Sequence, residues 1–390
     1  MSANAQLDVA RGHRVSVVIP CLNEAENIEE CVHAAYRVLW ENKLHGEVIV
    51  VDNGSEDGSG DLARAAGATV LDEPRRGYGQ AYLTGFAAAS GDYVVMIDAD
   101  LTYDFAEIPN FIQALDEGGE LVMGNRMNGV EPGAMPFLSR IGNPLLSGFL
   151  NLLFRTPVGD AYCGMRAFRR DVLPRLGLHA TGMEFASEMV IRAAKARLEI
   201  RELPIALRPR GGGVPKLAPL RDGWKGLRLM LLYNPTFLFM LPGFLFAFAG
   251  SVILGLVFAH ASLFGRVFLI HTLIGGSLLL VVGTQLAAFG LCGRAFAVYH
   301  LGDRDPWFER NGGRFHMEHG LLVGLAFMVA GGALGVVVVS DWIANGLGSL
   351  AQERVTILAA TLLIVGIQIF FTSFLLSIIG LRRPQDQLRR

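Results

Sequence analysis

The sequence predicts an α/β domain with a largely parallel sheet, followed by an α-helical membrane domain of four transmembrane helices. Short β-branched runs alternate with helical patterns through the first half, and four long stretches in the second half contain no Asp, Glu, Lys or Arg. The 390 residues are enough for two domains, and 52% hydrophobic residues is high for a purely soluble protein. The apolar excess lies almost entirely after Tyr233.

The first half is expected to order its elements as β-α-β-α. The β-branched runs predict strands at residues 15–20, 47–51, 69–71, 93–97 and 121–123. Helical patterns lie between them at residues 25–39, 58–66, 79–89 and 105–115. In such a sheet, ligands gather at the carboxyl ends of the strands.

The apolar stretches cover residues 237–259, 267–292, 320–340 and 355–381. Each is longer than the roughly 18 to 20 residues that a helix needs to cross a bilayer. Basic residues collect before the first stretch, between the second and third, and in the tail. The positive-inside rule therefore predicts a multi-pass integral protein of the inner or plasma membrane, with a cytoplasmic catalytic domain.

Five segments follow from these patterns. They are an N-terminal tail (1–14), the α/β domain (15–216), an interfacial juxtamembrane helix (217–234), the four-helix transmembrane domain (235–381) and a cytoplasmic basic tail (382–390). The third segment mixes basic residues with Trp and Leu, as interfacial helices do.

Charge and cysteine usage exclude several classes of protein. A net charge of -2 argues against a general nucleic-acid role. The four cysteines show no CxxC or other ligand spacing, so neither a zinc site nor a disulfide framework is expected. The apolar run at residues 15–20 is too short for a signal peptide.

Polar residues follow three of the predicted strands, at 20–24, 52–58 and 98–100. Taken alone, residues 52–58 are typical of a turn and helix cap, and Asp98 with Asp100 of a solvated turn. Their shared place at strand ends favours a site instead, because two carboxylates suit Mg²⁺ or Mn²⁺ on a diphosphate. No Walker A motif or GxGxxG is present.

Six motifs occur in the order seen in family 2 glycosyltransferases, at residues 17–24, 50–58, 76–81, 98–101, 124–126 and 160–166. Within that family the chain resembles the polyprenyl- and dolichol-phosphate hexosyltransferases of the dolichol-phosphate mannose synthase type. The resemblance implies a GT-A, Rossmann-like nucleotide-sugar-binding fold, an inverting reaction, a nucleotide-sugar donor and a divalent metal. Thr102 stands where those synthases often have Gln, which weakens any inference of mannose specificity.

The resemblance and the residue chemistry together select the candidate site residues. Those for the nucleotide sugar are Pro20, Asn23, Glu24, Asp52, Arg76, Gly77, Asp98, Arg210 and Lys216. Those for the metal are Asp98, Asp100 and Thr102; those for the acceptor phosphate are Arg126, Ser139, Arg140 and Arg166; those for catalysis are Asp100, Asp160, Arg126 and Glu184. Guanidinium groups suit phosphate because they bind its oxygens bidentately.

Three of these assignments have alternatives. Asp160 orients the acceptor or contacts the sugar, or it forms an ion pair with Arg166 that shapes the loop. Glu184 and Glu188 share a helix face, and Glu184 is preferred because it lies nearer the helix start. The three glycines at 211–213 allow a mobile loop to bring Arg210 and Lys216 over the donor.

The predicted function is transfer of a hexose from a nucleotide sugar to the phosphate of a membrane polyprenol. UDP-glucose is the first expected donor and GDP-mannose the second. A processive polysaccharide synthase is the first alternative, but its Gln-x-x-Arg-Trp motif is absent. A nucleotide-sugar-binding scaffold or a component of a lipid-linked sugar flippase is the second. The protein is also compatible with assembly into a homo-oligomer.

Overall fold

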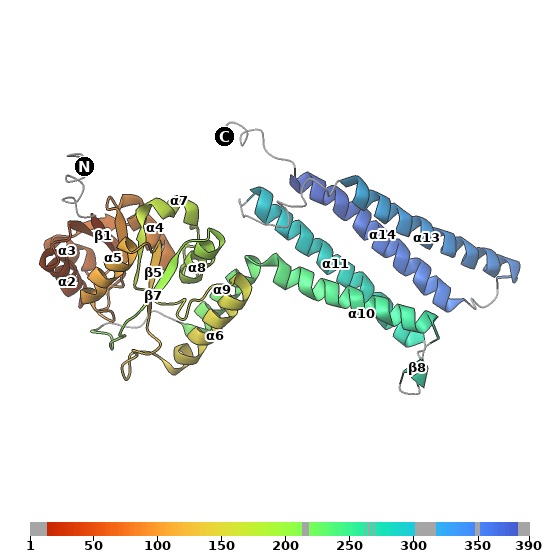
Figure 1. Ribbon diagram of the computed structural model, residues 1–390, viewed down its shortest axis with the longest axis horizontal. Helices are drawn as coiled ribbons and strands as arrows, with labels where there is room; N and C mark the ends of the chain where they lie inside the picture. Colours follow the sequence, from red (N-terminus) through yellow and green to blue (C-terminus); the bar gives the residue numbers. More distant parts are fainter. Residues whose placement is uncertain are drawn as a thin grey trace, which may run out of the picture. The chain divides into compact units, whose positions relative to one another are not determined.

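The computed structural model describes residues 14–212, 218–260, 262–263, 266–267, 270–300, 317–347 and 352–380. The chain divides into two compact units, Met1–Tyr233 and Asn234–Arg390. The first unit is built around one sheet and the second around long helices (Figure 1).

The first unit contains a seven-stranded sheet in the order β3-β2-β1-β4-β6-β5-β7. Its strands are β1 Val15–Cys21, β2 Gly46–Asp52, β3 Thr69–Asp72, β4 Tyr93–Met96, β5 Leu121–Asn125, β6 Arg166–Arg169 and β7 Ile200–Pro204. Only β6 runs antiparallel to its neighbours, β4 and β5. The prediction of a largely parallel sheet is confirmed, and β6 and β7 are additions to the five predicted strands.

Helices cover both faces of this sheet. One core contains buried residues of α2 Ile28–Glu41, α3 Ser59–Ala65 and α5 Ile108–Asp116. The opposite core contains residues of α4 Tyr78–Ala88, α8 Phe185–Lys195, α6 Phe137–Phe154 and α9 Pro219–Leu232. Because β1 and β4 are buried on both faces, their sequences are continuous apolar runs, as parallel strands between helical layers require.

Short elements complete the first unit. They are the 3-10 turns η2 Phe105–Glu107 and η3 Arg170–Val172 and the short helix α7 Leu173–Leu176. η2 leads directly into α5, so the predicted helix at 105–115 is divided between two elements. Asp104 caps η2, accepting a hydrogen bond from the Ala106 amide at 3.0 Å.

The second unit contains four helices long and apolar enough to cross a membrane, as the sequence predicts. They are Thr236–Phe258, which comprises the π-helical turn η4 Thr236–Met240 and α10 Leu241–Phe258; α11 Ile270–His300; α13 Met317–Ala344; and α14 Glu353–Gly380. The short strands β8 Ser262–Leu263 and β9 Arg266–Val267 pair between α10 and α11.

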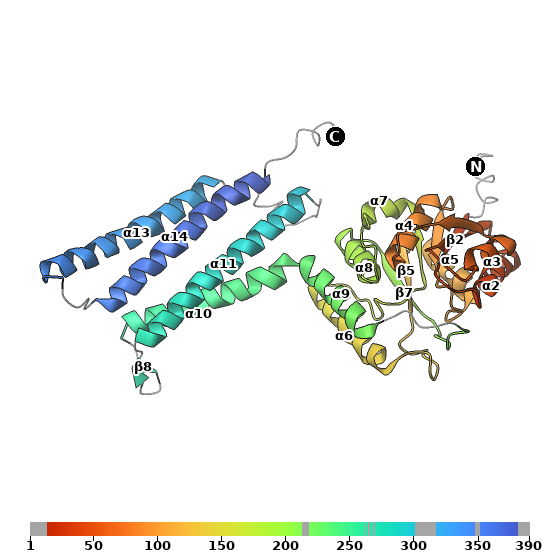
Figure 2. The same ribbon diagram turned by 180° about the vertical axis from the view of Figure 1, so that it is seen from behind.

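Small residues let these helices approach closely (Figure 2). A Cβ on Gly250 of α10 would lie 2.6 Å from the Gly276 carbonyl of α11. A Cβ on Gly324 of α13 would lie 2.7 Å from the Phe370 amide of α14. Both contacts bring helix backbones together, which is how membrane helices gain packing energy.

Candidate active site

The carboxyl ends of β1 and β2 are fastened together by hydrogen bonds. Asn23 has φ of 50°, which Asn tolerates better than most residues. The backbone amide of Asn23 donates to Ser55 Oγ at 2.9 Å, and its side-chain Oδ1 accepts from the backbone amide of Glu56 at 2.8 Å. Asp52 Oδ1 accepts from the Ser55 amide at 2.9 Å. The half-buried Pro20 lies beside this turn in β1, so the two predicted segments 20–24 and 52–58 meet here.

Arg210 brings a distant segment to the same edge of the sheet. Its Nη1 donates to Asp100 Oδ2 at 3.1 Å, and its Nη2 forms an ion pair with Glu24. The backbone is held as well: the Gly211 amide donates to the Asp100 carbonyl at 3.2 Å, and Arg210 Nε donates to the Gly212 carbonyl at 2.6 Å. The structure therefore unites three residues that are far apart in sequence, Glu24, Asp100 and Arg210.

Asp98 and Asp100 follow β4 and differ in their surroundings. Asp98 Oδ1 accepts from the hydroxyls of Tyr78 at 3.0 Å and Tyr82 at 3.3 Å. Asp100 Oδ1 accepts from the Thr102 hydroxyl at 2.6 Å, so Thr102 orients this carboxylate. Burial, followed by the charge of Asp100, raises the pKa of Asp98 to about 6. The two carboxylates are close enough to repel one another.

These two carboxylates fit a divalent cation. Mutual repulsion between half-buried carboxylates is relieved by a hard cation, and Mg²⁺ or Mn²⁺ needs only one or two protein carboxylates beside a diphosphate. The second oxygen of Asp98, Oδ2, accepts no hydrogen bond from the described residues. Asp98 Oδ2 faces Gly164, and a Cβ at position 164 would collide with this oxygen, so the position requires glycine. No group of three or more His, Cys, Asp or Glu forms a metal cluster among the described residues.

The turn before α4 forms another wall of the site. Arg76 is exposed, and its Nη2 donates to Glu56 Oε1 at 2.9 Å. The Gly77 amide donates to Asn53 Oδ1 at 2.6 Å. A Cβ at Gly77 would collide with the Thr181 carbonyl, so this position requires the close approach that only glycine permits.

Glu184 lies at the start of α8, in the same loop as Thr181. Its Oε2 is buried and has no hydrogen-bond partner among the described residues. A buried carboxylate oxygen without a donor is costly, which is typical of a group whose partner is a ligand. The predicted role of Glu184 toward the sugar hydroxyls remains a prediction, with this oxygen in its favour.

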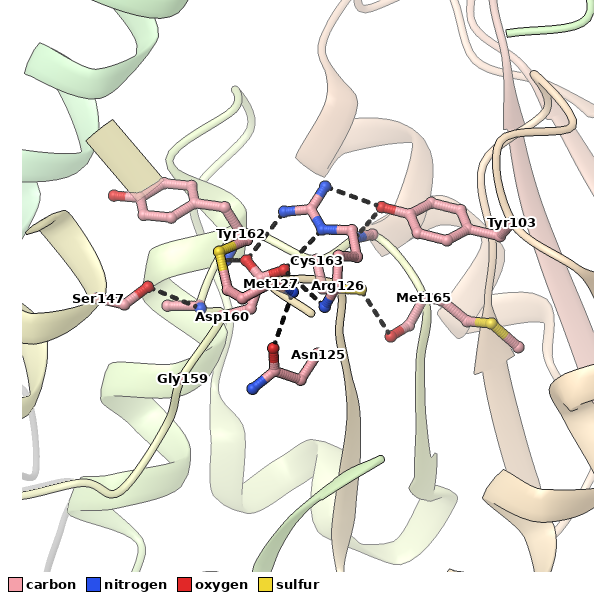
Figure 3. A network of polar contacts seen from close by, with 12 residues as sticks. Tyr103, Asn125, Arg126, Met127, Ser147, Gly159, Asp160, Tyr162, Cys163 and Met165 are labelled. Atoms are coloured by element: carbon pink, nitrogen blue, oxygen red, sulfur yellow. Dashed lines mark hydrogen bonds and ion pairs between the residues drawn. The ribbon is translucent and has the colours of Figure 1, made fainter. Parts of the chain in front are cut away.

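Arg126 and Asp160 form a buried bidentate ion pair (Figure 3). Arg126 Nε donates to Asp160 Oδ2 at 2.6 Å, and Nη2 donates to Oδ1 at 2.9 Å. The Arg126 Nη1 donates to the Tyr103 hydroxyl at 3.2 Å, and that hydroxyl accepts from the Gly164 amide at 2.8 Å. Asp160 is fully buried and Arg126 is 8% exposed. The ion pair of Asp160 is thus with Arg126, and the alternative pairing with Arg166 is wrong.

The other predicted phosphate residues lie in different settings. Arg166 is 1% exposed and donates to the carbonyls of Cys163, Ala161 and Ala186, so its guanidinium joins the loop at 161–163 to α8. Ser139 and Arg140 lie in the first turn of α6, and neither makes a side-chain hydrogen bond or ion pair within the described residues. Of the four phosphate candidates, Arg126 and Arg166 thus have their guanidinium groups bonded to other groups of the protein. Lys216 lies outside the described residues.

Sequence reasoning missed several side chains that form hydrogen bonds with the site residues. Tyr78, Tyr82 and Tyr103 donate to, or accept from, site residues, yet an aromatic residue in sequence is equally typical of a core. Asn53 donates to the carbonyls of Glu73 at 3.0 Å and Arg75 at 2.8 Å, besides holding the Gly77 turn. Its place directly after Asp52 at a strand end was the one available signal.

The mixed sheet, its two helical layers and the carboxylates at the strand ends define a GT-A glycosyltransferase. Comparisons with known proteins agree. Residues 16–177 match the model of Glycosyl transferase family 2, and residues 291–380 match the Glycosyltransferase family 2 C-terminal transmembrane region.

A low-salt glycan biosynthesis hexosyltransferase, Agl6 from Haloferax volcanii, is 38% identical over 372 residues, which cover 94% of this chain and 89% of the relative. The chain belongs to glycosyltransferase family 2, and it is a membrane protein.

Two further similarities are narrower. A dolichyl-phosphate hexose transferase from Haloferax volcanii is 36% identical over 211 residues, or 54% of this chain and 89% of that protein. A crystal structure of glucosyl-3-phosphoglycerate synthase from Mycobacterium tuberculosis, with Mn²⁺, UDP and glucosyl-3-phosphoglycerate, is 26% identical and covers 57% of this chain and 80% of that one. Its TM-score of 0.48 is too low to carry a conclusion.

Proposed function

We propose that this protein transfers a hexose from a nucleotide sugar to the phosphate of a membrane polyprenol, with inversion at the anomeric carbon. The observation that carries the proposal is the convergence of Asp98, Asp100, Glu24 and Arg210 at one edge of the sheet, in a chain that continues into four apolar helices. The similarity to a dolichyl-phosphate hexose transferase supports a lipid phosphate as acceptor. UDP-glucose is the first proposed donor and GDP-mannose the second.

The reaction asks little proton chemistry of the protein. A phosphate oxygen of the acceptor attacks the anomeric carbon, the bond from that carbon to the donor diphosphate breaks, and nucleoside diphosphate leaves with the bonding electrons. A phosphate monoester with a second pKa near 6 is mostly a dianion at pH 7, so no base is needed to remove a proton. The protein has to orient two anionic reactants and offset their charge.

Each part of the site has a task in this scheme. Asp98 and Asp100 would hold Mg²⁺ or Mn²⁺, which when bound supplies positive charge to the departing diphosphate. Arg210 offers a guanidinium beside the same carboxylates, suited to donor phosphate oxygens. Glu184 has a buried oxygen able to accept from a sugar hydroxyl. Positioning of the donor by these residues leaves its anomeric carbon open to the acceptor.

The surface of the first unit offers a face toward lipid. Phe137, Ile141, Leu145 and Leu152 follow one another at helical spacing on α6 and are 73%, 49%, 68% and 69% exposed. Trp224 of α9 is 61% exposed, and α9 packs beside α6 (Figures 1 and 2). An apolar helical face of this kind is unfavourable in water and typical of helices lying on a bilayer.

The chain keeps this face near a membrane by connectivity. α9 ends at Leu232, and the first apolar helix begins at Thr236. We propose that α6 and α9 rest on the headgroup layer, where the acceptor phosphate of a polyprenol is located. The distribution of basic residues supports a cytoplasmic location for this surface in a multi-pass protein.

Transfer of radiolabelled sugar from a panel of nucleotide sugars to undecaprenyl phosphate tests the proposal. We expect the purified protein with Mn²⁺ or Mg²⁺ to form a chloroform-soluble product, and Asp100→Asn to slow its formation at least about 10²-fold. Asp61→Asn, at a solvent-exposed ion pair with Arg64, is the matched control and should retain activity. Label that stays aqueous with every donor, despite measured donor binding, would contradict the lipid acceptor.

A further inference from the structure

Glu188 is a buried carboxylate with no place in the proposed chemistry. It lies on α8, one turn after Glu184, and is 1% exposed. Its Oε2 accepts from the backbone amides of His179 at 2.9 Å and Ala180 at 2.8 Å. Its Oε1 accepts from the Tyr233 hydroxyl at 2.9 Å. One side chain therefore connects a loop before α8 with the residue that ends the first unit.

The loop fixed by Glu188 supports the donor side of the active site. The backbone amide of Gln80 donates to the Thr181 carbonyl at 3.0 Å. Cβ atoms at Gly77 and Gly79 would collide with the Thr181 and Ala180 carbonyls, respectively. The turn at residues 77–80 thus lies directly against the loop, and a shift of the loop carbonyls would displace it.

The same turn is hydrogen-bonded to Asn53 and to Asp98, one of the predicted donor residues. The Gly77 amide donates to Asn53 Oδ1 at 2.6 Å, and the Tyr78 hydroxyl donates to Asp98 Oδ1 at 3.0 Å. A continuous set of hydrogen bonds and close contacts therefore runs from Glu188 through the loop at 179–181 to Asp98.

Tyr233 is held firmly at the other end. Arg192 and Lys195 of α8 place their cationic groups 5.1 and 5.0 Å from the centre of its ring. Burial, followed by the charge of Glu188, raises the pKa of Tyr233 to about 12. The hydroxyl is therefore neutral at physiological pH and keeps its proton to donate to Glu188.

We propose that Glu188 and Tyr233 are a positioning pair, which couples the segment entering the first membrane helix to the donor loop. Tyr233 follows α9 directly and precedes the first apolar helix, which begins at Thr236. A displacement of this segment breaks the bond to Glu188 and loosens the loop beneath residues 77–80. The inference rests on the proposed function for its kinetic consequence, but not for its structural one.

The test compares Tyr233→Phe with Tyr36→Phe in the full chain reconstituted in lipid nanodiscs. The Tyr36 hydroxyl is likewise a hydrogen-bond donor, to the Gly67 carbonyl at 2.9 Å, but it bonds to no site residue among those that the structure describes. Tyr233→Phe keeps the ring and its cationic neighbours, and it removes the hydroxyl that donates to the buried carboxylate of Glu188. We expect the Kd for UDP in the presence of Mn²⁺ to rise about tenfold, the fold-change that the loss of one hydrogen bond to a charged group produces. Tyr36→Phe should leave it unchanged.

Two further readouts separate positioning from general damage. Amide hydrogen exchange at residues 77–82 and 177–184 should accelerate in Tyr233→Phe, and exchange in β1 should not. In the transfer assay, the KM for the nucleotide sugar should rise about tenfold while kcat stays within about twofold. Glu188→Gln should share the effect, and adding it to Tyr233→Phe should cost little more, because both changes break the same contact.

UDP affinity and local exchange equal to those of the unmodified protein would overturn the coupling. So would equal acceleration of exchange across the whole sheet, because that result indicates loss of stability only. UDP binding and hydrogen exchange need no acceptor, so they decide the coupling even where no lipid-linked product forms. Absence of that product with every donor counts against the proposed function alone.

Discussion

Removal of the charge on Asp160 is expected to destabilise the catalytic unit before it affects chemistry. Asp160→Asn leaves the guanidinium of Arg126 buried without its counter-charge, because the pair is bidentate and Asp160 is fully buried. Breaking one partner of a buried ion pair costs about 3–5 kcal/mol. For a unit of this size each kcal/mol corresponds to about 2–4 °C, so Tm should fall by about 6–20 °C.

The measurement is thermal unfolding in detergent, with amide exchange in β5 as a local readout for the catalytic unit. Asp72→Asn is the matched control, because Asp72 pairs with Arg64 at 2.8 Å while being 72% exposed. That variant should change stability by about 0.5 kcal/mol or less. A double variant, Arg126→Met with Asp160→Leu, should recover much of the lost Tm, because apolar residues of similar volume often replace a buried pair at little cost.

The reasoning fails if Asp160→Asn unfolds at the temperature of the unmodified protein. A large loss of kcat with unchanged Tm would instead return Asp160 to the catalytic role that its motif predicts. The same comparison applies to Arg126, whose guanidinium is occupied by Asp160 and Tyr103. Its predicted contact with the acceptor phosphate needs at least one of these bonds to open.

Three further predictions concern the metal, the donor and the lipid. Asp100→Asn should weaken Mn²⁺ binding, measured by electron paramagnetic resonance, and lower kcat roughly 10²–10³-fold; unchanged Mn²⁺ affinity would remove this carboxylate from the metal site. Arg210→Ala should raise the donor KM about tenfold or more, since it removes the cation that faces Asp100; an unaltered KM would contradict a donor role. Ile141→Glu should raise the KM for the lipid acceptor and leave UDP binding unchanged. Trp40 lies on α2 and is 86% exposed, so Trp40→Glu is the control and should change neither quantity. Equal effects of the two substitutions would refute a lipid-facing α6.

The sheet could be read from the sequence wherever a strand is buried on both faces. The β-branched runs at β1 and β2 are continuous because helices cover them on either side, and the predicted strands end within one residue of the observed ones. β6 escaped prediction because its four residues include Arg166 and Arg169, which are typical of a loop. Arg166 is buried there with its guanidinium bonded to the carbonyls of Ala161, Cys163 and Ala186, and the sequence pattern does not predict that arrangement.

For the site, too, local sequence patterns predicted one part, and the rest depends on tertiary contacts. Acidic and amide residues at strand ends predicted the donor edge, because parallel strands deliver their ends to one place. The partners of these residues could not be predicted, since Arg210 meets Asp100 from 110 positions away. Glu188 is the clearest case: its helical spacing from Glu184 was visible, whereas its bonds to the loop at 179–180 and to Tyr233 depend on the tertiary fold.

The charge of the assembled edge gives an independent reason for a divalent cation. Asp98, Asp100 and Glu24 contribute three carboxylates, and Arg210 is the cation bonded to two of them. With the pKa of Asp98 at about 6, most of that negative charge is present at pH 7. A nucleotide-sugar diphosphate is also anionic, so this edge alone would repel its own donor. Two further positive charges held by Asp98 and Asp100 would offset the remaining negative charge of these four side chains, so the electrostatics of this edge favour metal dependence, as the family resemblance also does.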